Sequence, residues 1–328
     1  MRASRAPALA LVALGALGCR RSSVVTEPAP APSFATNADA VDAASDVVVT
    51  RRKRRGGTDV TFLVSSDAHF GYGYPDDLAK LSADPVKDPI GLETTHRALV
   101  PRLNTIAGTR WPSPIAGVVG KPRGLLISGD LTEWGRVEEW KRFVAWYGLQ
   151  GTEGPLHMPV FEVIGNHDKV HGPWVEQQVA ARHGGRFYSW DWDDLHLIAL
   201  GEAPDDEGLA WLARDLDTLD ADVPIVVYFH LALEGPWSTG HWFGDGNFKD
   251  RLATLLAHHR VVGIFHGHHH ATEHYAWHGI DVYKPGAVKG TAHTFAVVHV
   301  TDARASVAYR NFDSDTWQWS QDKALAPK

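Results

Sequence analysis

Short apolar runs that alternate with helical stretches are the feature that most constrains the fold. From Asp59 onward, runs of β-branched and other apolar residues predict buried strands. These runs are Thr61 to Val64, Leu125 to Ile127, Val160 to Ile164, Leu195 to Leu200, Ile225 to Phe229 and Val261 to Phe265. Between them, Thr94 to Ile106 and Val137 to Tyr147 are predicted helices, and a further helix-like stretch begins near Pro173. Strands that alternate with helices are typical of an α/β protein.

The C-terminal part shows a different pattern. Residues 273 to 309 contain short alternating β-like segments, with Gly279 and Gly286 at predicted turns. Tight turns join antiparallel strands, so we expect the second half of the sheet structure to be antiparallel.

The chain is long enough for one large catalytic domain or two small ones. It has 328 residues, of which 44% are hydrophobic. Cys19 is the single cysteine, which excludes an intramolecular disulfide and any metal site built from several thiolates. A metal site must therefore take its ligands from the 19 His and from the carboxylates.

The N-terminus is typical of an exported protein. Arg2 and Arg5 precede the apolar run Ala8 to Gly18, which is too short to span a bilayer. Gly18 and Cys19 resemble the end of the lipobox of bacterial lipoproteins, in which the Cys is acylated. We therefore expect residues 1 to 19 to be a signal peptide and the protein to be anchored by lipid, in the periplasm or on the cell surface. The alternative is an ordinary secretory signal in which Cys19 is incidental.

Residues 20 to 57 are predicted to be a disordered tether, because they are rich in Ala, Pro, Ser and Thr and lack an apolar period. The run Arg51 to Arg55 is interpreted as a solvated charged linker, with binding to anionic lipid head groups as the alternative. The first 57 residues carry nine Lys or Arg and four Asp or Glu, which leaves a net charge of −12 on residues 58 to 328. An acidic body disfavours nucleic acid as a partner.

Several of the predicted strands end in residues that bind metals or transfer protons. The segments that follow them are Asp67-Ala68-His69, Gly129-Asp130, Gly165-Asn166-His167-Asp168, His230 and Gly267-His268-His269-His270. The carboxyl ends of parallel strands meet at one edge of a sheet, where α/β proteins bind ligands. A single His after a strand is usually a surface or packed residue, but the convergence of all these segments indicates a metal site.

The order of these motifs resembles that of the calcineurin-like metallophosphoesterase superfamily, over roughly residues 59 to 300. The resemblance implies a four-layer α/β/β/α sandwich, in which helices flank two mixed β-sheets and a dinuclear metal site lies at the strand ends. It implies Asp67, His69 and His270 as ligands of one metal, Asn166, His230 and His268 as ligands of the second, and Asp130 as the bridge. It also implies His167 as a general acid that Asp168 orients. Ligation by nitrogen and oxygen is compatible with Fe, Mn or Zn.

Two cations held in this way lower the pKa of a shared water, so that hydroxide becomes available to attack phosphorus. The predicted function is therefore hydrolysis of a phosphodiester or a small phosphomonoester, with His167 protonating the leaving oxygen. No Arg follows Gly129-Asp130 closely, and the third motif ends in Asp168 where the Ser/Thr protein phosphatases have Glu, so a protein phosphatase is disfavoured. The alternatives are a non-catalytic metal-binding surface lipoprotein and a metal-dependent amide or ester hydrolase.

Other residues near the motifs have structural interpretations. His269 is expected to point away from its neighbours because alternate side chains of an extended segment face opposite sides, and His266 is expected to be packed. The loops Phe70 to Glu93 and Leu231 to Phe248 are candidates for substrate selection, because long loops beside a site are usually functional. The alternative for both loops is that their aromatic residues pack on one another.

Overall fold

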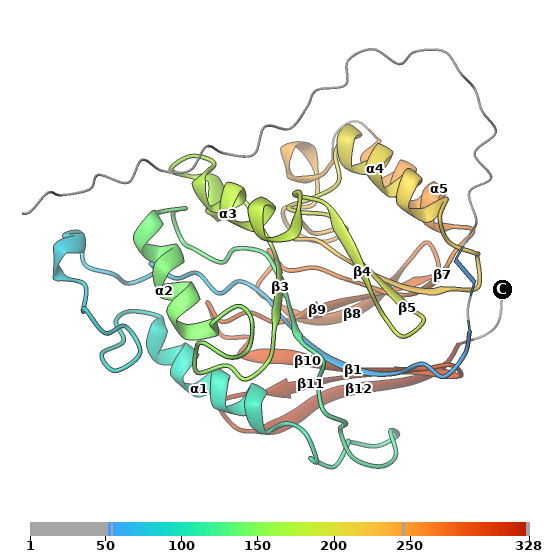
Figure 1. The fold of residues 1–328 in the computed structure, drawn as a ribbon, viewed down its shortest axis with the longest axis horizontal. Helices are drawn as coiled ribbons and strands as arrows, with labels where there is room; N and C mark the ends of the chain where they lie inside the picture. The colour runs from blue at the N-terminus through green and yellow to red at the C-terminus, as the bar shows by residue number, and fades with distance from the viewer. Residues whose placement is uncertain (1–51, 54, 245–246, 326–328) are drawn as a thin grey trace, which may run out of the picture. The chain divides into compact units, whose positions relative to one another are not determined.

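Two six-stranded β-sheets form the centre of the fold in this computed structural model, which describes residues 52, 53, 55–244 and 247–325 (Figure 1). The first sheet has the strand order β12-β11-β10-β1-β2-β3, and the second has the order β4-β5-β6-β7-β9-β8. In the first sheet the bounds are β1 Asp59–Ser65, β2 Leu125–Ser128, β3 Val160–Val163, β10 Thr294–Thr301, β11 Arg304–Asn311 and β12 Thr316–Ala324. In the second they are β4 Tyr188–Trp192, β5 Leu195–Ala199, β6 Pro224–Tyr228, β7 Arg260–Phe265, β8 Thr272–Trp277 and β9 Ile280–Pro285.

Both sheets are mixed. Strands β1, β2 and β3 are parallel, whereas β1, β10, β11 and β12 pair antiparallel. In the second sheet β5, β6, β7 and β9 are parallel, and β4 and β8 are antiparallel edge strands. The predicted antiparallel pairing is confirmed for β8 with β9 and for β10 with β11, whereas β9 also pairs parallel with β7. Gly279 lies in the turn between β8 and β9 with a φ of +78°.

Helices cover the outer face of each sheet. Their bounds are α1 Glu93–Thr105, α2 Val137–Tyr147, α3 Trp174–His183, α4 Asp206–Leu216 and α5 Phe248–Leu256, with short 3-10 turns at Leu78–Lys80, His167–Lys169 and Gly240–Trp242. Figure 1 shows α1 and α2 on one side of the sheets and α4 and α5 on the other. The predicted four-layer α/β/β/α sandwich is therefore confirmed.

The alternation of side chains along the strands explains the layers. On β1, Phe62 and Val64 pack against the second sheet, whereas Leu63 between them packs under α1 and α2. On the second sheet, Ile198 and Val227 face the opposite side and pack with α4 and α5. Strands buried on both faces need apolar residues throughout, which is why they occur in the sequence as continuous apolar runs.

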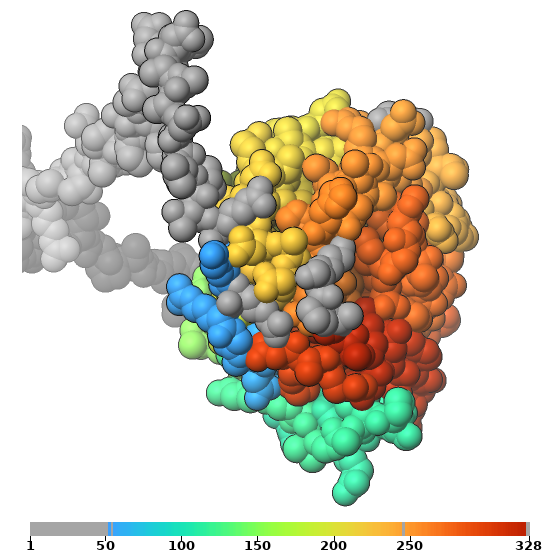
Figure 2. Space-filling view, turned by 90° about the vertical axis from the view of Figure 1, so that its right-hand side faces the viewer, coloured from blue at the N-terminus to red at the C-terminus, as the bar shows by residue number. Residues whose placement is uncertain are grey.

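The last residues of the predicted tether contact the domain. Arg52 forms an ion pair with Asp191, and the backbone N–H groups of Arg55 and Gly56 donate to the Asp194 carboxylate at 2.6 and 2.5 Å. In Figure 2 this blue segment lies against yellow segments of the chain and the red C-terminal strands. The predicted signal peptide with Cys19, and the tether up to residue 51, lie outside the described residues. Within the described part of the chain, no helix is long and apolar enough to cross a membrane.

Candidate metal centre

The carboxyl ends of β1, β2, β3, β6 and β7 carry the predicted ligands. The loop after β1 carries Asp67 and His69, the loop after β2 carries Asp130, and the turn after β3 carries Asn166. The remaining residues, His230, His268 and His270, follow β6 and β7. Since both sheets contribute, the candidate site lies where their strand ends meet.

The first group of ligands contains Asp67, His69, Asp130 and His270, whose ligand atoms all lie within 4.8 Å of one another. The Nε2 atom of His270 lies 3.2 Å from Asp67 Oδ1 and 3.2 Å from His69 Nε2. The His69 Nε2 atom is also 3.4 Å from Asp130 Oδ2. These atoms face one another across a space in which a single cation would contact all of them.

The second group contains Asp130, His230 and His268, again within 4.8 Å of one another. The Nε2 atom of His230 lies 3.2 Å from Asp130 Oδ2 and 3.1 Å from Asn166 Oδ1. Asp130 belongs to both groups, as a bridging carboxylate must. The structure thus brings together all the residues predicted as ligands of two metals.

The two carboxylates of the cluster are ionised, which favours the binding of cations. Asp67 and Asp130 are buried, and burial raises the pKa of a carboxyl group. For Asp67, hydrogen bonds from His270 and His69 outweigh this effect and hold the pKa well below its usual range. For Asp130, burial is outweighed by the charge of His230 beside it, and the pKa falls to about 2. Two buried, ionised carboxylates require compensating positive charge.

A buried nitrogen without a hydrogen-bond partner also fits a metal. Among the described residues, none forms a hydrogen bond with Nε2 of His268. A buried polar atom without a partner is costly, and such exceptions often mark an ion that the polar atom binds. Imidazole nitrogen is a normal ligand of Zn, Fe and Mn sites, so the residues present fit the dinuclear centre that their order predicts.

The backbone at the ligands is strained. The residues with φ in the left-handed region are Asp67 at 53°, His69 at 46°, Asp130 at 50°, His268 at 68° and His270 at 49°. Such φ values are uncommon in residues other than Gly, and they cluster at functional sites. The extended segment on which the expectation for His269 depends is therefore not present, because φ is left-handed at both His268 and His270.

Two motif glycines allow the strand ends to approach each other. A Cβ atom at Gly165 would collide with the Asp130 carboxylate, and one at Gly267 would collide with Ser66 and Asp67. Any side chain at these positions would push a ligand out of place. Glycine at these two positions therefore leaves the space that the ligand carboxylates occupy.

Glu133 is a functional residue that the sequence interpretation missed. Its Oε2 atom lies 2.7 Å from Nδ1 of His69, and its carboxylate accepts hydrogen bonds from Nζ of Lys289 at 2.9 and 3.0 Å. This close ion-pair contact places the Glu133 carboxylate beside the outer nitrogen of His69 and favours the ring orientation in which Nε2 faces the metal site. Glu133 follows Asp130 by three residues, but this spacing does not indicate which ring it contacts.

Asp168 has a different role from the predicted one. Its carboxylate is buried and accepts hydrogen bonds from the backbone N–H groups of Leu131, Thr132 and Gly165 and from the Thr132 hydroxyl, at 2.7 to 3.1 Å. It does not hold His167. Instead, Nδ1 of His167 lies 2.8 Å from the backbone carbonyl of Glu133. Asp168 joins the loop after β2 to the loop after β3, because Leu131 and Thr132 of the first loop and Gly165 of the second all donate to its carboxylate.

A hollow of about 240 Å³ opens beside the cluster. It is lined by Asp130, Asn166, His167, Trp237, Trp242, His268, His269 and His270. The loop Leu231 to Phe248 thus borders the site through two tryptophans. In the loop Phe70 to Glu93, Tyr74 instead forms a hydrogen bond with the buried Glu93, which agrees with internal packing.

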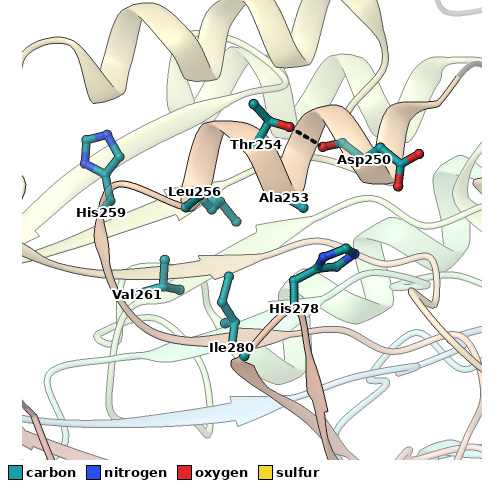
Figure 3. Close-up of a pocket in the computed structure, with 10 residues that line it drawn as sticks. Asp250, Ala253, Thr254, Leu256, His259, Val261, His278 and Ile280 are labelled. Carbon is teal, nitrogen blue, oxygen red and sulfur yellow. Dashed lines mark hydrogen bonds between the residues drawn. The ribbon is translucent and has the colours of Figure 1, made fainter.

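A larger hollow of about 500 Å³ lies away from the metal ligands, between α5 and the β8–β9 turn (Figure 3). Its lining includes Asp250, His259 and His278, and Figure 3 shows the two imidazoles at opposite ends. In the described part of the chain, none of its lining residues belongs to a group that could hold a metal ion. The chemistry therefore lies in the smaller hollow.

The fold and the two ligand groups define a metal-dependent hydrolase with a dinuclear site at the edge of a four-layer sandwich. The chain belongs to the calcineurin-like phosphoesterase family, whose model matches residues 60–272. It is thus a phosphoester hydrolase that depends on metal ions. No curated protein sequence matches the chain.

Solved structures with the same fold include a dimetal phosphatase from Danio rerio, with a TM-score of 0.55 and 11% identity over 81% of this chain and 99% of that protein. The purple acid phosphatase PPD1 from yellow lupin seeds has a TM-score of 0.54 and 14% identity, over 84% of this chain and 55% of its own. GAP50, the anchor in the inner membrane complex of Plasmodium, has a TM-score of 0.52 and 12% identity over 82% and 90%. At these identities the likeness shows the fold alone.

The substitution Asp130→Ala should remove most of both metal ions, because it deletes the carboxylate shared by the two ligand groups. Metal content after loading with Mn²⁺ and gel filtration, measured by mass spectrometry, checks this result. The control is Asp313→Ala, which removes an exposed carboxylate that pairs with His293. Full metal content in the folded Asp130→Ala protein would contradict the bridging assignment.

The substitution Glu133→Gln should lower metal affinity by about 10- to 100-fold, because mutation of a residue that orients a metal ligand typically weakens metal binding by this factor. Competition with a chromogenic chelator measures the affinity. Glu138→Gln, at an exposed position nearby in the sequence, should change nothing. An unchanged affinity in Glu133→Gln would show that His69 does not need Glu133 for its orientation.

Proposed function

We propose that the protein hydrolyses a phosphodiester or a small phosphomonoester, with His167 as the general acid, and that it acts outside the cytoplasm as a lipid-anchored protein. The observation that carries the catalytic part is the position of His167, which lines the hollow outside the two groups that share Asp130. His167 also lies near His69 and Glu133, but its Nδ1 is 2.8 Å from the backbone carbonyl of Glu133 and is therefore engaged in a hydrogen bond. Metal binding alone does not require a His at this position. A purely metal-binding lipoprotein is therefore the weaker candidate.

The hydrogen bond of His167 supports its role. The backbone carbonyl of Glu133 only accepts, so Nδ1 of His167 carries a hydrogen and donates it. This leaves Nε2 as the nitrogen that exchanges a proton with substrate. The side chain is 29% exposed, so it remains accessible from the hollow. A His held in one tautomer and open to the site is suited to proton transfer.

The chemistry divides between the bound ions and the chain. Two metal ions in this centre would lower the pKa of a water between them and neutralise the phosphoryl oxygens. Asp67, Asp130 and the imidazoles hold the ions in place, while Glu133 and the strained backbone keep the ligands oriented. His167 gives its proton to the departing oxygen, which typically contributes about 10²- to 10⁴-fold in rate.

The lining of the hollow supports a substrate with one phosphoryl group. Among the described residues that line it, none is Lys or Arg. A di- or triphosphate would place further negative charge in a hollow whose described lining offers no cationic side chain, and the nearby Lys289 is already paired with Glu133. A diester carries a single negative charge at neutral pH and needs no partner beyond the metal centre. The metals themselves are Fe, Mn or Zn, in keeping with ligation by nitrogen and oxygen.

Location outside the cytoplasm is supported by the sequence alone, through Arg2, Arg5, the apolar run Ala8 to Gly18 and Cys19. In a membrane-anchored enzyme, small phosphorylated compounds on the outer side would be the accessible substrates.

Hydrolysis of 4-nitrophenyl phosphate and bis(4-nitrophenyl) phosphate, with Mn²⁺ and with excess chelator, tests the proposed function. We expect turnover of at least one ester in Mn²⁺ and its loss in chelator, because the buried carboxylates cannot act on phosphate without cations. Preference for the bis-ester would assign a phosphodiesterase. Absence of turnover in protein shown to hold two metals would favour the metal-binding lipoprotein.

The substitution His167→Ala should preserve metal content and lower the rate most for esters with poor leaving groups, because these need a proton on the departing oxygen. A series of aryl phosphate esters with leaving groups of increasing pKa measures the dependence. The loss should approach 10²- to 10⁴-fold, as an order of magnitude, at the poor end of the series. Equal loss for every leaving group would contradict the general-acid role. His171→Ala, at an exposed residue close by in the sequence, is the control.

A further inference from the structure

Three residues that bind no metal form one side of the hollow, and we call them the aromatic wall: Trp237, Trp242 and His269. The two tryptophans come from the loop between β6 and α5, and His269 comes from the turn after β7. The ring of Trp242 lies 4.9 Å from that of His268, and the ring of Trp237 lies 5.8 Å from it. A molecule held by the metals through a phosphoryl group would therefore place its organic part against this wall.

Trp237 is held in an unfavourable state for a large aromatic residue. Its side chain is 55% exposed, so it contributes little to the core, and its φ is +54°. Left-handed φ is costly for a bulky residue, and such strain occurs where surrounding structure imposes it, often at ligand sites. Packing against the core therefore does not account for the exposure of Trp237.

The loop that carries Trp237 is fixed at both sides of the residue. Nζ of Lys249, on α5, donates hydrogen bonds to the backbone carbonyls of Leu233 and Ser238. The Ser238 hydroxyl donates to the carbonyl of Gly235 at 2.7 Å, and Phe243 is buried below the loop. The indole is thus positioned before any ligand arrives, which lowers the entropic cost of binding.

His269 adds one hydrogen-bond donor to the wall. Lys284 is only 2% exposed, and its Nζ lies 2.6 Å from Oε2 of Glu273 and 3.0 Å from Nδ1 of His269. An ammonium group only donates, so Nδ1 of His269 accepts and Nε2 carries the hydrogen. The buried Lys284 therefore sets the tautomer of a ring that borders the hollow.

The chemistry of the wall selects its ligand. Two indoles and one imidazole offer flat faces and an N–H donor, and the described lining adds no Lys or Arg. Stacking on aromatic faces favours a flat ring over a saturated group of the same size. We propose that the aromatic wall binds a flat, uncharged aromatic ring of the substrate, with an acceptor atom facing His269, while the metal centre holds the phosphoryl group. This inference rests on the proposed function and names its substrate class: phosphate esters of alcohols that carry an aromatic ring.

Titration calorimetry of the Mn²⁺-loaded protein with inert phosphonates tests the inference without turnover. Methylphosphonate, cyclohexylphosphonate and phenylphosphonate share the metal-binding group and differ in the organic part. We expect phenylphosphonate to bind about threefold or more tightly than cyclohexylphosphonate, since aromatic pairs gain beyond area burial. A nucleoside 5′-phosphonate in the same series distinguishes the two sources of the ring. If the natural ring is a nucleobase, this compound should bind more tightly than phenylphosphonate; if it is a simple aryl group, it should not.

The variants Trp237→Leu and Trp242→Leu locate the ring site. Each should lower the ratio of phenylphosphonate to methylphosphonate affinity by about threefold or more, because Leu keeps an apolar surface but lacks the aromatic face. Trp211→Leu, on α4 and outside the hollow, should leave the ratio unchanged. Metal content and circular dichroism check that each variant is loaded and folded. If one of the two variants does not fold, the affinity ratio of the other tests the ring site.

The outcomes separate the two hypotheses. Equal affinity for the phenyl and cyclohexyl compounds, or an unchanged ratio in both folded tryptophan variants, would overturn the ring site and leave the phosphoesterase proposal intact. Failure of every phosphonate to bind, together with absence of ester hydrolysis by metal-loaded protein, would overturn the proposed function and the ring site with it.

Discussion

Two ionised carboxylates buried at the ends of neighbouring parallel strands are the constraint on which the rest of the site depends. Asp67 and Asp130 are almost completely shielded from solvent, so their charges need positive partners, which the surrounding imidazoles and bound metal ions can supply. Imidazoles from both sheets supply further ligand atoms, and motif glycines leave the space in which these groups meet. The two-sheet architecture is therefore the means by which ligands from distant parts of the chain share one small volume.

The carboxylates near the centre perform distinct tasks because their partners differ. Asp130 belongs to both groups of side chains that could hold a metal ion. Glu133 faces the outer nitrogen of His69 and is balanced by Lys289, so it orients a ligand. Asp168 meets only hydrogen-bond donors of the backbone and of Thr132, so it fastens two loops together. Three carboxylates thus have different roles because their contacts differ: one lies in the predicted metal site, one orients a predicted ligand and one connects two loops.

The substrate side of the site follows a different principle. Five of the seven predicted ligands have left-handed φ at the ends of strands, whereas the two tryptophans of the aromatic wall come from the loop between β6 and α5. Loops tolerate change in sequence and length far better than strands, so they are the natural place for specificity. Lys249 and Lys284 act here as internal supports: one fixes the backbone around Trp237 and the other sets the ring nitrogen of His269. A rigid scaffold and a pinned loop together provide a preorganised site.

Apolar periodicity in the sequence determined the α/β class, six of the buried strands and the helices α1, α2 and α3, and the residues that end each run marked the site, since these are local properties. The four-layer arrangement was implied by the resemblance of the motifs to a known family, and α4 and α5 were not predicted. The tertiary structure decided which groups touch. Glu133 as the partner of His69, Asp168 as a loop fastener and His269 at the hollow depend on contacts between segments far apart in the chain. They also depend on left-handed φ values at residues such as His268 and His270, which no periodic pattern reveals because a pattern assumes regular backbone. The sequence specifies which chemical groups are present, but the fold decides which of them are in contact.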